Sequence, residues 1–289
     1  MKISDILKEK SFSFSFEVFP PNDDTQLPKL LETTLKLKAL NPDFISVTYG
    51  ALGGTRNNTF AIAKNMKDIQ DTNAVTHLTC VNMTEQEAQE TLKAMRYFGI
   101  ENILALRGDK GEHDVPGAFT YASDLISYIH SNQPGVFSIG AACYPEGHVE
   151  ARNKTEDILN LKIKADLGLD YLLTQMFFDN DLFYDFMDRL TLAGIKVPVI
   201  AGIMPVINAK QILKITKFSG ATLPKKFVRI IERYEHHPEA LKEAGIAYAS
   251  EQIIDLISWG IKGIHLYTMN SFSTADKICR NIDSVRHAR

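Results

Sequence analysis

The 289-residue chain has few cysteines, little net charge and no apolar run long enough to span a bilayer. Its three cysteines, Cys80, Cys143 and Cys279, form no CxxC pair. An odd number at wide spacing favours a reduced, cytoplasmic protein over a disulfide-rich secreted one. The first ten residues are charged and lack the apolar core of a signal peptide. The net charge is −3 and no basic cluster indicates a nucleic-acid surface, so we expect small-molecule partners, no nucleic acid and no membrane.

Several common catalytic and nucleotide-binding motifs are also missing. Gly50, Gly53 and Gly54 have the wrong spacing for GxGxxG, and there is no P-loop, GxSxG or HExxH motif. The pair His236-His237 is expected to lie in a loop, so no metal site is predicted. If a dinucleotide binds, loops must hold it in place of a Rossmann crevice.

The first apolar stretch carries a clear strand pattern. Serine and phenylalanine alternate over residues 11–16, which predicts a strand with two unlike faces. Ser15 and Glu17 share the polar face, and Pro20 and Pro21 end the strand. Glu17 therefore lies at the C-terminal end of this strand, either as a solvated strand end or as a catalytic acid.

Apolar periodicity predicts seven further strands, at 44–49, 75–81, 102–106, 136–144, 171–179, 197–205 and 263–270. Helices are predicted between them at 25–40, 59–71, 84–98, 121–132, 155–167, 181–193 and 208–218. A longer helical insertion is predicted at 225–260, before strand eight, and a last helix after that strand.

The alternation of strands and helices is typical of an α/β protein. Eight βα units favour a (β/α)8 TIM barrel with an extra helical insertion before strand eight, formed by residues 1–289 as a single catalytic domain. A doubly wound open sheet is the alternative, because periodicity does not report whether a sheet closes.

Polar side chains gather where these strands end. In a barrel of this kind, functional groups lie at the C-terminal ends of the strands and in the loops that follow. His77 and Thr79 lie within the third predicted strand on one parity. Gln175 lies within the sixth predicted strand, and Tyr267 within the eighth. The residues at or after the other strand ends are Glu17, Thr48, Tyr49, Arg107, Gly108, Asp109, Tyr144, Glu146, His148, Asp179 and Asn270.

Two groups of charged residues have alternative interpretations. Arg107 and Asp109 share one strand face, and either pair with each other or bind a ligand, the guanidinium a phosphate and the acid a polar ring edge. Asp157, Asn160 and Lys164 fall on one helical face. That face is either solvated or grips the ribose and diphosphate of a nucleotide.

Eight short segments, in order along the chain, resemble the 5,10-methylenetetrahydrofolate reductase family. They are FSFEVFPP (14–21), SVTYGA (46–51), HLTC (77–80), ALRGD (105–109), YASDL (121–125), YPEGH (144–148), TQMFFD (174–179) and GIMP (202–205). The similarity runs to about Asn270 and looks like the short bacterial type of the enzyme. It implies an FAD-containing barrel that reduces methylenetetrahydrofolate with NADH or NADPH, in one-carbon metabolism and methionine biosynthesis, and a homo-oligomer.

The resemblance also implies residue roles. Glu17 matches the family's general acid, and Gln175 and Gln211 match folate contacts, with Tyr267 expected beside them. Asp109 is expected to act at the flavin. The positions expected to bind FAD are Thr48, Tyr49, His77, Arg107, Gly108, Asp109, Ala122, Tyr144, His148, Asp157, Asn160 and Lys164.

The chemistry of the implied reaction agrees with these roles. The substrate's methylene carbon accepts hydride once N10 is protonated and the five-membered ring opens, so an acid is required. We therefore expect surroundings that raise the pKa of Glu17 above that of a free glutamate, while Asp109 stays charged beside the flavin. One flavin face serving both partners predicts ping-pong kinetics.

Two positions depart from the family pattern. Ser271 stands where the family commonly has an arginine, and Ile215 stands where some members have an aromatic residue. Both belong to the folate and nicotinamide side in the family. The alternatives are therefore another barrel flavin oxidoreductase and a non-catalytic folate- or flavin-binding protein; Glu17 and Asp109 speak against the latter.

Overall fold

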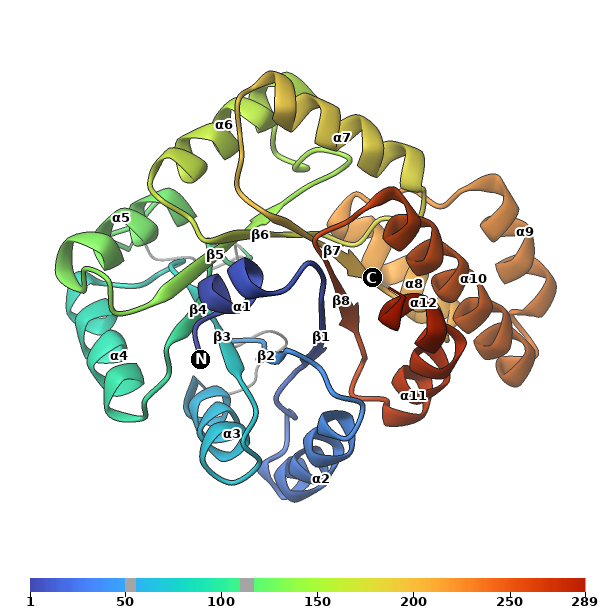
Figure 1. Cartoon of the computed structure of the whole chain (residues 1–289), viewed down its shortest axis with the longest axis horizontal. Coiled ribbons are helices and arrows are strands. Elements are labelled where there is room, and N and C mark those ends of the chain that lie inside the picture. The colour runs from blue at the N-terminus through green and yellow to red at the C-terminus, as the bar shows by residue number, and fades with distance from the viewer. Residues whose placement is uncertain (50–55, 110–116, 289) are drawn as a thin grey trace.

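The strands form a closed barrel in the computed structural model, which describes residues 1–49, 56–109 and 117–288. All eight strands are parallel, in the order β1 to β8, and β8 pairs with β1 (Figure 1). This confirms the TIM barrel and excludes the open sheet. The glycines at 50, 53 and 54 lie outside the described residues.

The observed strands are shorter than predicted at several ends. Their bounds are β1 Ser13–Val18, β2 Phe44–Val47, β3 Ala74–Thr79, β4 Asn102–Leu106, β5 Ser138–Cys143, β6 Tyr171–Thr174, β7 Val199–Ile203 and β8 Gly263–Tyr267. The largest error concerns β6, which ends at Thr174 although the prediction continued to residue 179. The prediction extended too far because Phe177 and Phe178 continue the apolar run of the strand. In the structure both are loop residues whose side chains are buried.

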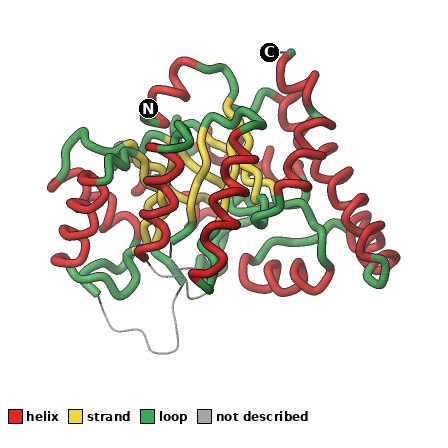
Figure 2. Tube along the Cα trace, turned by 90° about the horizontal axis from the view of Figure 1, so that it is seen from below, coloured by secondary structure: helices red, strands yellow, loops and turns green. Residues whose placement is uncertain are grey.

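The helices surround the barrel (Figure 2). Those that follow β1 to β7 are α2 Leu27–Lys38, with the 3-10 turn Asp24–Gln26 before it, α3 Arg56–Asp68, α4 Glu85–Tyr97, α5 Ala122–Asn132, α6 Lys154–Asp166, α7 Asn180–Leu192 and α8 Ala209–Ser219. The insertion forms two helices, α9 Lys225–Tyr234 and α10 Pro238–Trp259, and His236 and His237 lie in the loop between them, as predicted. Helices α11 Phe272–Asn281 and α12 Asp283–His287 follow β8. None of the helices in the described ranges combines the length and apolar character needed to span a bilayer.

The first helix, α1 Ile3–Glu9, was not predicted, although it closes one end of the barrel. Ile3, Ile6 and Leu7 are buried at the i, i+3, i+4 spacing of an apolar helix face and belong to the cluster that fills the barrel interior. The backbone N–H of Ile3 donates to Asn102 Oδ1, at the first residue of β4. Helix α1 therefore covers the N-terminal strand ends, and the barrel opens at the other end.

The two faces of β1 have the environments that its alternation predicts. Phe14 and Phe16 point outward and belong to the core between strands and helices. Ser15 and Glu17 point into the barrel, where Ser15 contacts the imidazole of His265 in β8. The polar face of β1 is therefore the interior one, and it leads to the open end.

Candidate active site

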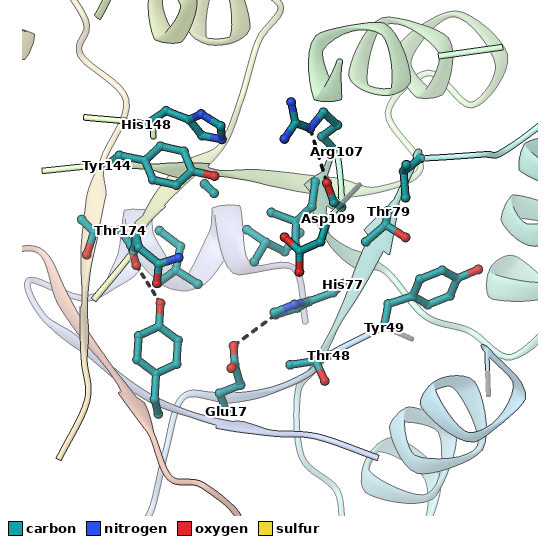
Figure 3. A pocket seen from close by; sticks show the side chains of 18 of the residues that line it. Glu17, Thr48, Tyr49, His77, Thr79, Arg107, Asp109, Tyr144, His148 and Thr174 are labelled. Atoms are coloured by element: carbon teal, nitrogen blue, oxygen red, sulfur yellow. Dashed lines mark hydrogen bonds and ion pairs between the residues drawn. The ribbon is translucent and has the colours of Figure 1, made fainter. Parts of the chain in front are cut away.

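Two adjoining cavities lie at the C-terminal strand ends. The mouth cavity, about 670 Å³, is lined by residues from seven of the strands or their following loops, from Glu17 in β1 to Tyr267 at the end of β8 (Figure 3). The side cavity, about 510 Å³, lies beside α5 and α6. The residues that line both are Leu106, Arg107, Ala142, Tyr144 and His148. Because they share a wall, one elongated ligand can occupy both cavities.

Nearly all predicted site residues line these cavities. The mouth cavity is lined by Glu17, Thr48, Tyr49, His77, Arg107, Gly108, Asp109, Tyr144, His148, Gln175 and Tyr267. The side cavity adds Ala122, Asp157, Asn160 and Lys164. Gln211 is absent from the described residues that line either cavity. The structure thus brings together groups that are up to 250 residues apart in the sequence.

Three further polar residues after strand ends have structural partners. Asp179 accepts a hydrogen bond from the backbone N–H of Asp181 at the start of α7. Asn270 bonds both backbone groups of Phe19. Glu146 accepts from the hydroxyl of Thr222, which ties the β5 loop to the segment after α8.

Glu17 lies on the floor of the mouth cavity among three polar groups. Its Oε2 is 3.3 Å from His77 Nε2, 3.4 Å from Ser46 Oγ and 3.7 Å from His265 Nε2. The side chain is 17% exposed, so it reaches the cavity while most of it is covered. Figure 3 shows the contact with His77.

The surroundings of Glu17 lower its pKa, contrary to the expectation from the sequence. Burial raises the pKa of this carboxyl, but hydrogen bonds and charges from His265 and His77 outweigh burial and lower it to about 2. The imidazoles therefore favour the carboxylate in this structure. A general acid at this position needs a nearby source of protons.

Arg107 pairs with Glu150 and not with Asp109. Its two terminal nitrogens lie 2.6 and 2.7 Å from the two oxygens of Glu150, a bidentate ion pair that raises the pKa of Arg107. Asp109 is exposed and lines the mouth cavity. The acid is therefore placed to face a ligand there.

The polar face of α6 lies partly inside the protein. Asp157 is only 7% exposed, and burial raises its pKa. Burial lowers the pKa of Lys164, whose Nζ donates to the carbonyl of Ala142 at 2.7 Å. The solvated alternative is thus excluded for Asp157, whereas Lys164 is half-buried and Asn160 is exposed. Asp157 and Lys164 place opposite charges on the wall of the side cavity.

Two features suit the close approach of a flat, polar ligand to the mouth cavity. Gly108 has φ +89°, and a Cβ there would lie 2.8 Å from Val81 Cγ1, so only glycine fits. The buried Thr48 Oγ1 has no hydrogen-bond partner in the described structure, which leaves it available to a ligand. On the opposite wall, burial raises the pKa of Tyr144 to about 12, so its hydroxyl stays a donor at neutral pH.

Comparison with known proteins decides the family. The family described as methylenetetrahydrofolate reductase matches residues 2–283. The chain belongs to this family. The 5,10-methylenetetrahydrofolate reductase of Escherichia coli K12 is 36% identical over 272 residues, covering 93% of this chain and 90% of the relative. Methylenetetrahydrofolate reductase (NADH) 1 of Arabidopsis thaliana is 33% identical over 302 residues, covering 100% of this chain. The chain spans about half, 51%, of that plant relative.

A solved structure supports the fold independently. An uncharacterized protein from Clostridium thermocellum, described as binding two copies of 5-methyl-5,6,7,8-tetrahydrofolic acid, superposes with a TM-score of 0.72 over 99% of this chain and 98% of that one. The sequence identity is 15%, so this likeness shows the barrel alone.

The positions that depart from the reductase family pattern are absent from the described residues that line the two cavities. Ser271 is the N-cap of α11, where its Oγ accepts from the backbone N–H of Thr274. Ile215 lies on α8 and packs against the apolar cluster formed with α9 and α10. Gln211, on the same helix, is partly exposed at its first turn.

Our interpretation of the sequence missed three residues of the site. Ser46 and His265 contact Glu17, and Glu150 holds Arg107. The sequence held a signal for two of them: His265 shares the parity of Tyr267 in β8, and Ser46 in β2 shares that of Thr48, which follows this strand. Nothing in the spacing indicated Glu150, because its partner is 43 residues away.

Proposed function

We propose that this protein is an FAD-dependent methylenetetrahydrofolate reductase, which uses NADH or NADPH to reduce 5,10-methylenetetrahydrofolate to 5-methyltetrahydrofolate. Its family supports this reaction, as do bacterial relatives of that name, which match nearly all of the chain. The observation that carries the proposal is the place of Glu17, a mostly buried acid on the floor of a cavity that Asp109 also lines.

Glu17 would act on the folate. Protonation of N10 opens the five-membered ring and leaves a cationic methylene group that accepts hydride, and an acid in this role is worth roughly 10²–10⁴-fold in rate. Asp109, which lines the same cavity, would favour that cation electrostatically. Gln175 and Tyr267 line the cavity on the β6 and β8 side and are placed to contact the folate.

The residues present fit FAD. Thr48 offers an unused hydroxyl, and Gly108 lets the backbone approach a ring. Lys164 supplies positive charge for a diphosphate, and Arg107 would do so on exchanging Glu150 for the ligand. The shared wall of the two cavities suits a ligand with a ring system at one end and a nucleotide at the other. When bound, FAD carries hydride from the nicotinamide to the folate. We further propose that residues 1–289 act as one catalytic domain.

The test measures two activities of the purified holoenzyme. It should be yellow, with a flavin spectrum that NADH or NADPH bleaches, and it should form 5-methyltetrahydrofolate with ping-pong kinetics. Glu17→Gln should lower folate reduction by 10²-fold or more, roughly the range of general acid catalysis, and leave oxidation of NADH by menadione nearly unchanged. Equal loss of both activities would contradict the role of Glu17. Menadione reduction without any folate turnover by the wild type would indicate a different flavin oxidoreductase.

A further inference from the structure

Charges of opposite sign balance around the side cavity. The described residues that line it include three cations and three carboxylates, namely Arg107, Arg152, Lys164, Glu150, Glu156 and Asp157. Of these, Arg107 is the one that also lines the mouth cavity. Figure 3 shows Arg107 and His148 at one edge of the mouth cavity and Glu17 at the other. An anionic diphosphate that enters the side cavity therefore meets cations that already have carboxylate neighbours.

Two of the three carboxylates are fixed where they are. Asp157 is buried on α6, where Lys164 is its nearby cation. Glu156 Oε2 accepts a hydrogen bond from the backbone N–H of Arg152 at 2.6 Å, and its Oε1 accepts from the Arg152 side chain. Asp157 thus cannot turn to solvent unless α6 moves, and Glu156 cannot leave without freeing a backbone donor at the start of that helix.

Glu150 is held in a different way. It lies in the loop between β5 and α6, and its side chain is 49% exposed. The backbone of this residue is anchored separately, because its N–H donates to His148 Nδ1 at 3.1 Å. The carboxylate can therefore rotate into solvent while the loop keeps its shape.

The carboxylate of Glu150 occupies the edge of Arg107 that a phosphate group would use. Its two oxygens lie 2.6 and 2.7 Å from the two terminal nitrogens of the guanidinium. Carboxylates and phosphates both offer a pair of oxygens to the parallel N–H donors of an arginine. The remaining nitrogen, Nε, donates to the carbonyl of Gly108 at 3.4 Å. A diphosphate thus gains a bidentate contact with Arg107 only when Glu150 leaves.

We propose that Glu150 is a displaceable counterion for Arg107, which covers the diphosphate subsite in the flavin-free protein and turns to solvent when the flavin nucleotide binds. The ion pair must open before the arginine can meet the ligand, so Glu150 lowers the affinity for the nucleotide and slows its binding. The inference rests on the proposed function, because the diphosphate belongs to the proposed FAD.

The test titrates flavin-free protein, prepared from the purified holoenzyme, with FAD and with riboflavin. Glu150→Gln should bind FAD about 10-fold more tightly than the wild type, and faster, because no ion pair has to open first. Its affinity for riboflavin should stay within about twofold, since riboflavin lacks the diphosphate that would meet the arginine. Quenching of flavin fluorescence measures the affinities, and stopped flow measures the association rates.

A double-mutant cycle shows whether the effect passes through Arg107. In an Arg107→Gln background there is no guanidinium to cover, so the further change Glu150→Gln should alter the FAD affinity by less than about twofold. General repulsion between Glu150 and the diphosphate would instead tighten FAD binding equally in both backgrounds. That result would overturn the inference.

Asp185→Asn is the matched control. Asp185 pairs with Arg189 on α7 at 2.9 Å, and Arg189 donates to the carbonyl of Pro145 in the same loop that carries Glu150. Neither Asp185 nor Arg189 is among the described residues that line the two cavities. This variant should keep the wild-type affinities for FAD and riboflavin. The thermal unfolding temperature of each variant shows whether it folds.

Three further outcomes decide against the proposal. Weaker FAD binding by a folded Glu150→Gln protein overturns it, because Glu150 would then hold Arg107 in place for the ligand. Unchanged FAD affinity and rate do the same, as does a tightening that riboflavin shares. If the wild type binds no FAD, the proposed function fails instead.

Discussion

The two sides of the barrel mouth are built differently. On one side, β4, β5 and α6 carry Arg107, Tyr144, Asp157 and Lys164 around the side cavity. On the other, β7 and β8 adjoin α8, α9 and α10, which pack into an apolar cluster of their own with residues such as Phe227. We call these the nucleotide side, after the ligand proposed for it, and the insertion side.

The difference shows what fixes a functional residue in place. On the nucleotide side, strand register and one packed helix determine each position, and the predicted residues all line a cavity. On the insertion side, Gln211 depends on how α8 packs against α9 and α10, and it lies away from both cavities among the described residues. Gln175, which follows β6 directly, does line the mouth cavity. Distance from the barrel strands therefore separates the predicted residues that line a cavity from Gln211, which does not line one among the described residues.

The largest effect is expected on the nucleotide side. Lys164→Met leaves the buried carboxyl of Asp157 without its nearby cation and removes a positive charge from the side cavity. We expect flavin affinity to fall by at least about 100-fold, so that the protein purifies nearly colourless. Absorbance of the purified protein and flavin fluorescence titration measure this.

The control for this variant lies on the same helix. Lys162 pairs with Asp166 at the surface of α6, and Lys162→Met should keep full flavin content. A yellow, stoichiometric Lys164→Met protein would show that the nucleotide side does not depend on this buried charge. Flavin binding would then depend on groups of the nucleotide side other than Lys164.

The sequence predicted the parts of the site that depend on local periodicity. Glu17 was placed correctly on the polar face of β1, because alternation alone assigns that face. Arg107 was placed at the end of β4, whose predicted bounds are those observed. The positions of Glu17 and Arg107 could be predicted because the alternation within one strand determines the face on which a side chain lies. This does not depend on which strands are its neighbours.

The features that the sequence did not predict depend on closure of the barrel. Ser15 lies opposite His265 only because β8 pairs with β1, a contact between residues 250 positions apart. The low pKa of Glu17 depends partly on the same closure, which places His265 beside the acid, and partly on His77 in β3. Helix α1 was missed because a short segment with three apolar residues is ambiguous until the open barrel end it covers is known.

Glu17 lies between the two sides, and its pH dependence tests the closure contact. Its pKa is lowered from 4.5 to about 2 in the folded protein, so its contribution to stability is fully present above about pH 4.5 and is lost as pH falls toward 2. Glu17→Gln should cost on the order of 2 kcal/mol of unfolding free energy at pH 7. That difference from the wild type should shrink between pH 4.5 and 3, measured by urea unfolding.

A difference that stays constant with pH would contradict the low pKa. Asp23→Asn provides the comparison, because Asp23 is exposed and its pKa is lowered only by local bonds to Thr25. We expect its effect on stability to be small at every pH.

The smallest effects should distinguish the two glutamines. Gln175→Ala removes a side chain from the wall of the mouth cavity, and we expect the KM for methylenetetrahydrofolate to rise about 10-fold, the loss of roughly one hydrogen bond. Gln211→Ala should change this KM by less than about twofold, because Gln211 lies outside both cavities among the described residues. Steady-state kinetics at saturating NADH measure both.

Equal effects of the two substitutions would instead mean that α8 moves when folate binds. Helix α8 ends at its C-cap Gly220, which has φ +73°, and just beyond it the hydroxyl of Thr222 donates to Glu146. Thr222→Val removes that hydroxyl, so a mobile α8 would respond with a changed KM in this variant as well. A fixed α8 would leave the KM of Thr222→Val unchanged, and the insertion side would then act as a rigid wall of the mouth.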